Sequence, residues 1–223
     1  MTIRRTDWLL FAIMALFAIG SLVGCLASPA KPTPYGTFEE RLAQGRQYLD
    51  DNKVQEAIAE FQAAARLDSS SAEAHFRLGN AYYQDQRLDD AAQSYQKALE
   101  LDSNHVDARS NLGAVYYEQM QFDKAANEFS QAISLRQDDA DIHYNLGATY
   151  VQQNKLDPAI AEFREALRLN PQLARAYFGL GNAFKLQGKT ADAVEALERF
   201  LSMDESPELH SVAQSLLAEL KGP

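Results

Sequence analysis

Small and aromatic residues recur along the chain with one fixed period of 34 residues, from Phe38 to Pro207. Within each period the apolar positions lie three or four residues apart, which is the spacing of an amphipathic helix. No insertion interrupts the period, and such regular self-similarity is typical of repeat proteins. The recurring positions are a glycine (Gly45, Gly79, Gly113, Gly147, Gly181), an alanine (Ala57, Ala91, Ala125, Ala159, Ala193), a first aromatic set (Tyr48, Tyr82, Tyr116, Tyr150, Phe184), a second aromatic set (Phe61, Tyr95, Phe129, Phe163) that ends in Leu197, and a second alanine (Ala64, Ala98, Ala132, Ala166) that Phe200 replaces.

Each period predicts two helices joined by a short turn, as in Ala72–Gln84 followed by Leu88–Leu101. Gly79 and Ala91 are small, as residues must be where two helices approach closely, and aromatic residues such as Tyr95 fill the remaining space. One hairpin cannot bury its apolar face alone, so neighbouring hairpins are expected to stack and share a core. The pattern therefore predicts five helical hairpins in a row.

Several sites carry residues that favour the first turn of a helix. Ser71 and Thr190 have hydroxyl side chains that can cap a helix, and Asp157-Pro158 pairs an acidic residue with a proline. We expect helices to begin at these sites.

Ser206-Pro207 is expected to open a final helix with one apolar stripe and one polar face. It is interpreted as a cap that covers the fifth hairpin, since the end of a repeat array needs a polar outer surface. The alternative is an amphipathic helix that binds a partner. The stripe contains Leu209, Val212, Ala213, Leu216, Leu217 and Leu220, and the polar face contains Glu208, Ser211, Gln214, Ser215 and Glu219.

The period resembles that of the tetratricopeptide repeat family. The family motif appears whole in one repeat, as Leu146-Gly147, Tyr150, Ala159, Phe163, Ala166 and Pro171. Departures fall in the end repeats, where Gln44 replaces the usual leucine and Phe200 replaces a small residue. The resemblance implies an all-α fold, an α-solenoid of five hairpins plus a C-terminal capping helix. The expected divisions are repeats at 38–71, 72–105, 106–139, 140–173 and 174–207, with the cap at 208–223.

The first residues of the chain are typical of a targeting signal. Arg4 and Arg5 precede an uncharged apolar run, which is the layout of a secretory signal peptide over residues 1–24. The run closes with Leu22-Val23-Gly24-Cys25, which resembles the lipobox of bacterial lipoproteins. That resemblance implies cleavage before Cys25 and lipidation of its sulfur.

The alternative is an uncleaved transmembrane anchor that extends to about residue 27, since some 20 apolar residues span a bilayer. Both readings tether the chain to a membrane and place the repeats outside the cytoplasm. Residues 25–37 then form a proline-rich spacer. By the sorting rules of the lipoproteins that this segment resembles, Leu26 after Cys25, rather than Asp, implies the outer membrane, facing the periplasm, in a cell with two membranes.

Composition narrows the possible partners. The formal net charge of −10 disfavours nucleic acid. A single cysteine excludes an intrachain disulfide. The sequence has no phosphate loop, nucleophile elbow or zinc-protease motif, so we expect no enzyme, no cofactor and no small-molecule substrate. His75 and His143 share one repeat position and are interpreted as packing residues, so no metal site is expected.

In the tetratricopeptide repeat family, the first helix of each hairpin lines a concave groove that receives peptides. Aromatic side chains there supply contact area at low entropy cost, and asparagine amides can bond the N–H and C=O of a peptide. The alternative is that individual aromatic residues pack against neighbouring hairpins. Nine residues are expected to line the groove: Phe76, Asn80, Tyr83, Asn111, Tyr117, Tyr144, Asn145, Phe178 and Asn182.

The charged residues at the rim of the groove should determine which kind of partner binds. Chaperone-binding members of the family hold a terminal carboxylate with lysines and an arginine, but the matching positions here are Glu39, Glu73, Asp107 and Asp141. An acidic rim repels a carboxylate, so a protein or peptide with an apolar or basic segment is expected.

The leading hypothesis is a membrane-tethered scaffold that assists assembly or localisation of an envelope complex. In layout it resembles the lipidated tetratricopeptide pilotins of type IV pilus secretins, and also lipoprotein adaptors for peptidoglycan-modifying enzymes. A self-associating structural module is the alternative from another class.

Overall fold

In the computed structural model, every secondary-structure element among the residues that it describes, 36–203 and 207–222, is an α-helix. The predicted all-α fold is therefore confirmed. The signal or anchor, Cys25 and all but the end of the spacer lie outside the described residues. The helices are α2 (Phe38–Asp50), α3 (Val54–Leu67), α4 (Ala72–Gln84), α5 (Leu88–Leu101), α6 (Val106–Glu118), α7 (Phe122–Leu135), α8 (Ala140–Gln152), α9 (Leu156–Leu169), α10 (Ala174–Leu186), α11 (Thr190–Leu201) and α12 (Pro207–Lys221).

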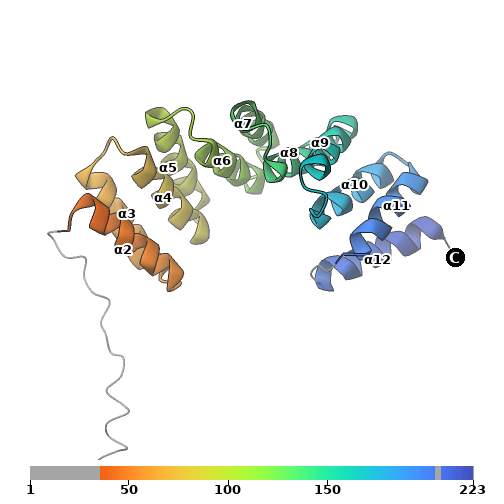
Figure 1. The fold of residues 1–223 in the computed structure, drawn as a ribbon, viewed down its shortest axis with the longest axis horizontal. Helices are drawn as coiled ribbons and strands as arrows, with labels where there is room; N and C mark the ends of the chain where they lie inside the picture. The colour runs from red at the N-terminus through yellow and green to blue at the C-terminus, as the bar shows by residue number, and fades with distance from the viewer. Residues whose placement is uncertain (1–35, 204–206, 223) are drawn as a thin grey trace, which may run out of the picture. The chain divides into compact units, whose positions relative to one another are not determined.

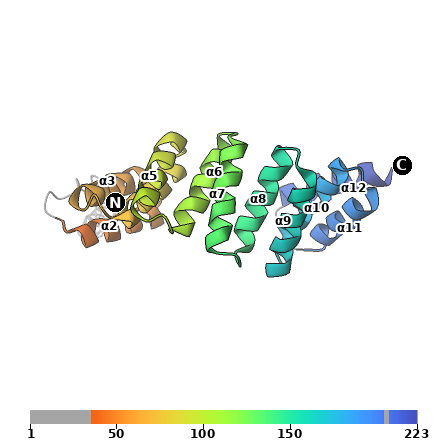
Figure 2. The same ribbon diagram turned by 90° about the horizontal axis from the view of Figure 1, so that it is seen from above.

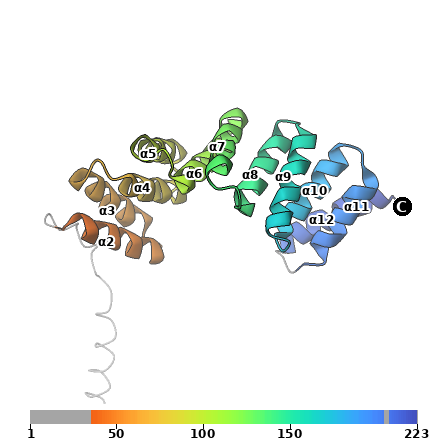
Figure 3. The same ribbon diagram turned by 45° about the horizontal axis from the view of Figure 1, so that its top comes forward.

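The helices pair as hairpins, from α2/α3 to α10/α11, and each second helix packs on the first helix of the next hairpin. Figures 2 and 3 show these hairpins side by side in chain order. Each first helix also contacts the first helix of the next hairpin, whereas successive second helices have no comparable contact in the described part of the chain. The first helices therefore lie closer together and form one surface, which we call the inner wall. In Figure 1, α5 and α7 lie on the outer side of this wall.

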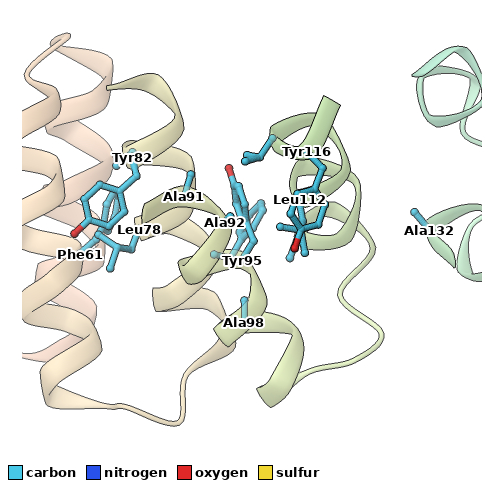
Figure 4. Close-up of a cluster of buried hydrophobic side chains, with 14 of the residues drawn as sticks. Phe61, Leu78, Tyr82, Ala91, Ala92, Tyr95, Ala98, Leu112, Tyr116 and Ala132 are labelled. Carbon is cyan, nitrogen blue, oxygen red and sulfur yellow. The ribbon is translucent and has the colours of Figure 1, made fainter. Parts of the chain in front are cut away.

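Close contact within each hairpin depends on the recurring glycine. A Cβ atom at Gly79 would lie 2.6 Å from the ring of Tyr95, and one at Gly113 would lie 2.9 Å from the ring of Phe129. Such distances are too short for carbon atoms, so the aromatic ring occupies the space that the glycine leaves. Figure 4 shows the resulting layers between hairpins, with Phe61 near Tyr82 in one of them.

Each first helix ends in the same left-handed turn, a Schellman motif. In the first turn, the N–H of Asn52 donates to the carbonyl of Leu49 and the N–H of Lys53 donates to that of Tyr48. The left-handed residue recurs in every hairpin: Asn52, Gln86, Met120, Asn154 and Gly188 have φ values of 57°, 60°, 58°, 57° and 74°.

Two of the expected helix starts are confirmed, but the turn supplies their caps. The helix α11 begins at Thr190 and α9 begins at Leu156, one residue before Asp157-Pro158. Their N-caps are Lys189 and Lys155, and neither makes a side-chain capping hydrogen bond. The lysine that precedes each helix is also the last residue of the Schellman motif, so the turn itself positions the next helix. Ser71 does cap α4, with its hydroxyl accepting from the N–H of Ala74 at 3.2 Å.

Replacing Met120 by glycine should stabilise the fold. Met120 is 78% exposed and adopts φ 58°, so it loses few contacts and relieves a strained backbone. The left-handed conformation costs a non-glycine residue about 1–2 kcal/mol, and the added chain entropy of glycine offsets part of that gain. We expect the free energy of unfolding, measured in urea, to rise by about 0.5–1 kcal/mol for Met120→Gly. Gly188→Ala should lower it, and the prediction fails if both substitutions act in the same direction.

The final helix α12 packs on α11, as expected for a cap. Ala213 is fully buried, and four leucines of the predicted stripe pack around it. Val212 is the exception, since 48% of it is exposed at the edge of the stripe. Phe200 is fully buried beside Phe178 and His210, with ring centroids 5.4 Å away in both cases. The large residue at the repeat's usual alanine position thus fills the junction with α12.

Three hairpins contain a polar pair between the fourth residue of the first helix and the second helix. The pairs are Arg41–Glu60 at 2.7 Å, Arg109–Glu128 at 2.9 Å and His143–Glu162 at 2.6 Å. His143 is buried and its other ring nitrogen lies 3.2 Å from the carbonyl of Gln137, so this histidine packs in the core. Among residues 36–203 and 207–222, no helix is long and apolar enough to cross a membrane.

Candidate functional site

The inner wall contains two adjoining hollows where α4, α6 and α8 meet. They share Tyr83 and Ala114, and together they include six of the nine residues that the sequence predicts for the groove. One hollow, of about 290 Å³, is lined by Asn80, Tyr83, Gln84, Tyr95, Asn111 and Ala114. The other, of about 210 Å³, is lined by Tyr83, Ala114, Tyr117, Glu118, Phe129, Tyr144, Asn145 and Ala148.

The other three predicted residues lie outside these hollows. Phe76 is only 7% exposed, because its ring packs against Tyr95 and His105 with centroids 6.1 Å and 4.5 Å away. Its assignment to the groove surface is therefore corrected to a core residue. Phe178 packs on Phe200 beside the cap and is half-buried, and Asn182 is also half-buried on α10.

Asparagine side chains differ along the wall. The Oδ1 atom of Asn80 accepts hydrogen bonds from the hydroxyl of Tyr95 at 2.8 Å and from Nδ2 of Asn111 at 2.9 Å. The side-chain amide of Asn145 has no hydrogen-bond partner among the described residues, although it lines the smaller hollow. Its donor and acceptor are therefore free for a guest's backbone.

The fifth hairpin keeps Asn182 but lacks the asparagine that hairpins 3 and 4 carry as Asn111 and Asn145. Gly179 occupies the position equivalent to Asn145, and a Cβ atom there would lie 2.7 Å from the ring of Phe163. The ring of Phe163 thus occupies the space that a side chain at this position would need.

Two tyrosines at the edge of the wall bond to the next first helix. The hydroxyl of Tyr83 donates to Oε1 of Glu118, and Nε2 of Gln152 donates to the hydroxyl of Tyr117 at 3.3 Å. Burial, reinforced by the bond to Glu118, raises the pKa of Tyr83 to about 12. Burial also raises the pKa of Tyr95 and of Tyr144. All three phenols are neutral at physiological pH, so the wall presents apolar rings with hydroxyl dipoles.

The acidic rim expected from the sequence is largely neutralised, which corrects the argument made from it. Glu73 pairs with Arg77 at 2.6 Å on the same helix. Asp107 pairs with Arg136 at 2.9 Å, and Asp141 pairs with Arg175 of the next hairpin. Glu39, the fourth carboxylate of the rim, has no cationic partner in the described part of the chain, and neither has Glu118 of the inner wall. Sequence reasoning missed Glu118, whose only signal was its place beside Tyr117.

A larger hollow, of about 610 Å³, lies away from the inner wall between α9, α10 and α11. The guanidinium carbon of Arg164 lies 5.6 Å from the ring centroid of Phe184 there. At the equivalent junction of hairpins 2 and 3, Nε2 of Gln96 instead donates to the hydroxyl of Tyr116 at 2.7 Å. Because phenylalanine has no hydroxyl, arginine packing replaces that hydrogen bond. This hollow is thus a variant of a repeated packing contact.

The described residues contain no group of three His, Cys, Asp or Glu side chains that could hold a metal ion. What the inner wall offers is contact area and hydrogen bonds, which are the features of a binding surface.

Several solved structures share the fold. The crystal structure of MamA aligns with a TM-score of 0.68 at 24% identity, covering 77% of this chain and 96% of MamA. YrrB, described as "a TPR protein with an unusual peptide-binding site", aligns with a TM-score of 0.68 at 23% identity over 79% of this chain and 91% of YrrB. The pilF protein of Pseudomonas aeruginosa aligns with a TM-score of 0.69 at 22% identity over 82% of this chain and 88% of pilF.

Among curated proteins, none matches the sequence significantly. Tetratricopeptide repeat models, in contrast, match overlapping segments of the chain at residues 42–106, 94–126, 116–154, 149–188 and 174–207. These matches cover the five hairpins almost completely, in agreement with the 34-residue period, the recurring glycine and the stacked helices. The chain belongs to the tetratricopeptide repeat family.

Proposed function

We propose that this protein is a membrane-tethered scaffold that binds a protein or peptide segment along its inner wall. The observation that carries the proposal is the convergence of Tyr83, Tyr117 and Tyr144 on one hollow beside the free amide of Asn145. Tyrosine rings give large contact areas with little loss of side-chain entropy, and the amide can pair with an extended backbone. The peptide-binding site named for YrrB supports this use of the fold.

Site-specific crosslinking in cells tests the proposal. A photo-reactive amino acid at Tyr117 or Tyr144 should capture one main partner, because both side chains line the hollow. The matched control carries the same probe at Gln93, an exposed residue of α5 that lines neither hollow. Equal capture from Gln93 would contradict binding at the inner wall.

The tether and the process served are further parts of the proposal. Lipidation of Cys25, or an uncleaved anchor in its place, would hold the repeats at a membrane outside the cytoplasm. Assistance in assembling an envelope complex is the process we propose for it, and an adaptor for peptidoglycan-modifying enzymes is an alternative of the same kind. Mass spectrometry should find acylated Cys25 at the N-terminus, and Cys25→Ser should release the protein from membranes. An intact Met1 would favour the anchor.

Self-association is the second candidate function, and one observation favours it. Leu67, Leu101 and Leu135 end α3, α5 and α7 at equivalent positions and are 57%, 37% and 42% exposed. A repeated row of exposed leucines is the kind of apolar surface through which copies of a protein associate. Sedimentation of the full chain in detergent at increasing concentration should show association if this surface is used.

A further inference from the structure

The smaller hollow of the inner wall combines aromatic walls with one carboxylate. Tyr83, Tyr117 and Tyr144 supply the rings, and Glu118 lines the same hollow. Glu118 is exposed, and its one polar contact in the described residues is with the hydroxyl of Tyr83. A carboxylate that has a hydroxyl partner but no cation keeps its full negative charge available to a guest.

Glu118 is the one charged residue among those that line this hollow, and the ion pair beside Tyr144 carries no net charge. Arg175 lies over Tyr144, with its guanidinium carbon 4.4 Å from the ring centroid, and pairs with Asp141. This contact also shows that a tyrosine of the wall accepts a guanidinium group on its ring. The net charge that the hollow offers is therefore that of Glu118, which excludes an anionic guest and favours a cationic one.

The size of the hollow favours a single side chain. Its volume is about 210 Å³, below the roughly 300–1,000 Å³ of pockets that bury drug-sized ligands. Ala114 and Ala148 are small lining residues, so they leave room between the tyrosines. Aromatic rings around a carboxylate form the kind of site that holds ammonium or guanidinium groups through cation–π attraction.

We propose that the hollow formed by Tyr83, Tyr117, Glu118 and Tyr144 receives an arginine or lysine side chain from an extended segment of a partner protein. The inference rests on the proposed function and specifies the chemistry of the partner. The cation pairs with Glu118 and packs against the tyrosine rings. The free amide of Asn145 bonds the backbone beside it, and the acidic charge of the whole chain favours the approach of a basic segment.

Selection of short random peptides displayed on phage against the full chain in nonionic detergent tests this inference. Peptides that bind the inner wall are identified as those lost with Ala148→Leu, because the larger side chain fills the hollow. Among them, arginine or lysine should be enriched at one position. For a selected arginine peptide, Glu118→Gln should weaken the affinity about tenfold, since it removes one charge–charge contact in a partly desolvated site.

The variant Glu118→Gln is designed to leave the fold intact, and its control makes the same charge change elsewhere. Glu118→Gln keeps the size of the side chain and an acceptor for Tyr83, and the position is exposed, so the fold should be unaffected. Glu100→Gln makes the same charge change on α5, where Glu100 pairs with Lys97, and should leave the affinity unchanged.

The outcomes separate the two proposals. Basic enrichment together with a loss specific to Glu118→Gln supports the cation site. Peptides that are lost with Ala148→Leu but show no enrichment of arginine or lysine overturn the cation site and leave the proposed function standing. The same holds for basic peptides whose affinity does not change with Glu118→Gln. If no selected peptide depends on Ala148, both proposals fail.

Discussion

Phe163→Ala should lower the free energy of unfolding by about 3–5 kcal/mol, the range for removing a large buried aromatic ring. Phe163 is 1% exposed and lies between two first helices. A Cβ atom at Gly147 of α8 would lie 2.8 Å from its ring, and one at Gly179 of α10 would lie 2.7 Å away. Glycine has no side chain that could move into the vacated space, so the cavity persists and the contact between hairpins 4 and 5 weakens.

Urea unfolding of the full chain, followed by far-ultraviolet circular dichroism, measures this loss. Leu135→Ala is the control, since it also removes an apolar side chain, but from a position that is 42% exposed. It should change stability by no more than about 0.5 kcal/mol. Comparable effects of the two substitutions would mean that Phe163 does not join the hairpins as the structure indicates.

The 34-residue period was sufficient to predict the fold because each repeated residue has a local packing role. The helices α4 and α5 begin and end at the residues expected from the sequence, since a recurring glycine, alanine and aromatic ring specify how close two helices lie. The turn between them was harder to predict. Its left-handed residue is Gln86 or Met120 in some repeats, and neither residue type signals a left-handed conformation by itself.

The site was predicted less completely than the fold. Phe76 and Tyr144 occupy equivalent repeat positions, yet the ring of Phe76 is buried against Tyr95 and His105, whereas Tyr144 lines a hollow. That difference depends on the residue types at other positions, such as His105 where the repeat of Tyr144 has Leu173, and the position of the aromatic residue does not specify them.

The ion pair between Asp141 and Arg175 was also not predicted from the sequence. Asp141 appeared as part of a bare acidic rim, and its partner Arg175 stands 34 residues away on the next first helix. The repeat places such residues side by side in space, so a search for opposite charges one period apart could have found this pair. Glu118 had no such signal, because the feature that leaves it available to a guest is the absence of a cationic partner.

The pair Arg41–Glu60 should prove far more important when one partner is removed than when both are. Its atoms Nη1 and Oε2 lie 2.7 Å apart, and the two side chains are only 8% and 4% exposed. Glu60→Leu leaves a guanidinium buried without a counter-charge, and the Nε atom of Arg41 already lacks a hydrogen-bond partner. We expect this substitution to cost about 3–5 kcal/mol of unfolding free energy.

The double variant Arg41→Met/Glu60→Leu should recover most of that loss, because apolar side chains of similar volume avoid the cost of desolvating two charges. Urea unfolding of both single variants and the double variant measures the coupling between the residues. Glu100→Gln breaks the exposed pair with Lys97 and should cost no more than about 1 kcal/mol. If the double variant is as unstable as Glu60→Leu, the lost unfolding free energy comes from the packing of these two side chains and not from an unpaired charge. Recovery would instead show that the repeat tolerates an apolar pair here, and that the cost of Glu60→Leu comes from the unpaired charge.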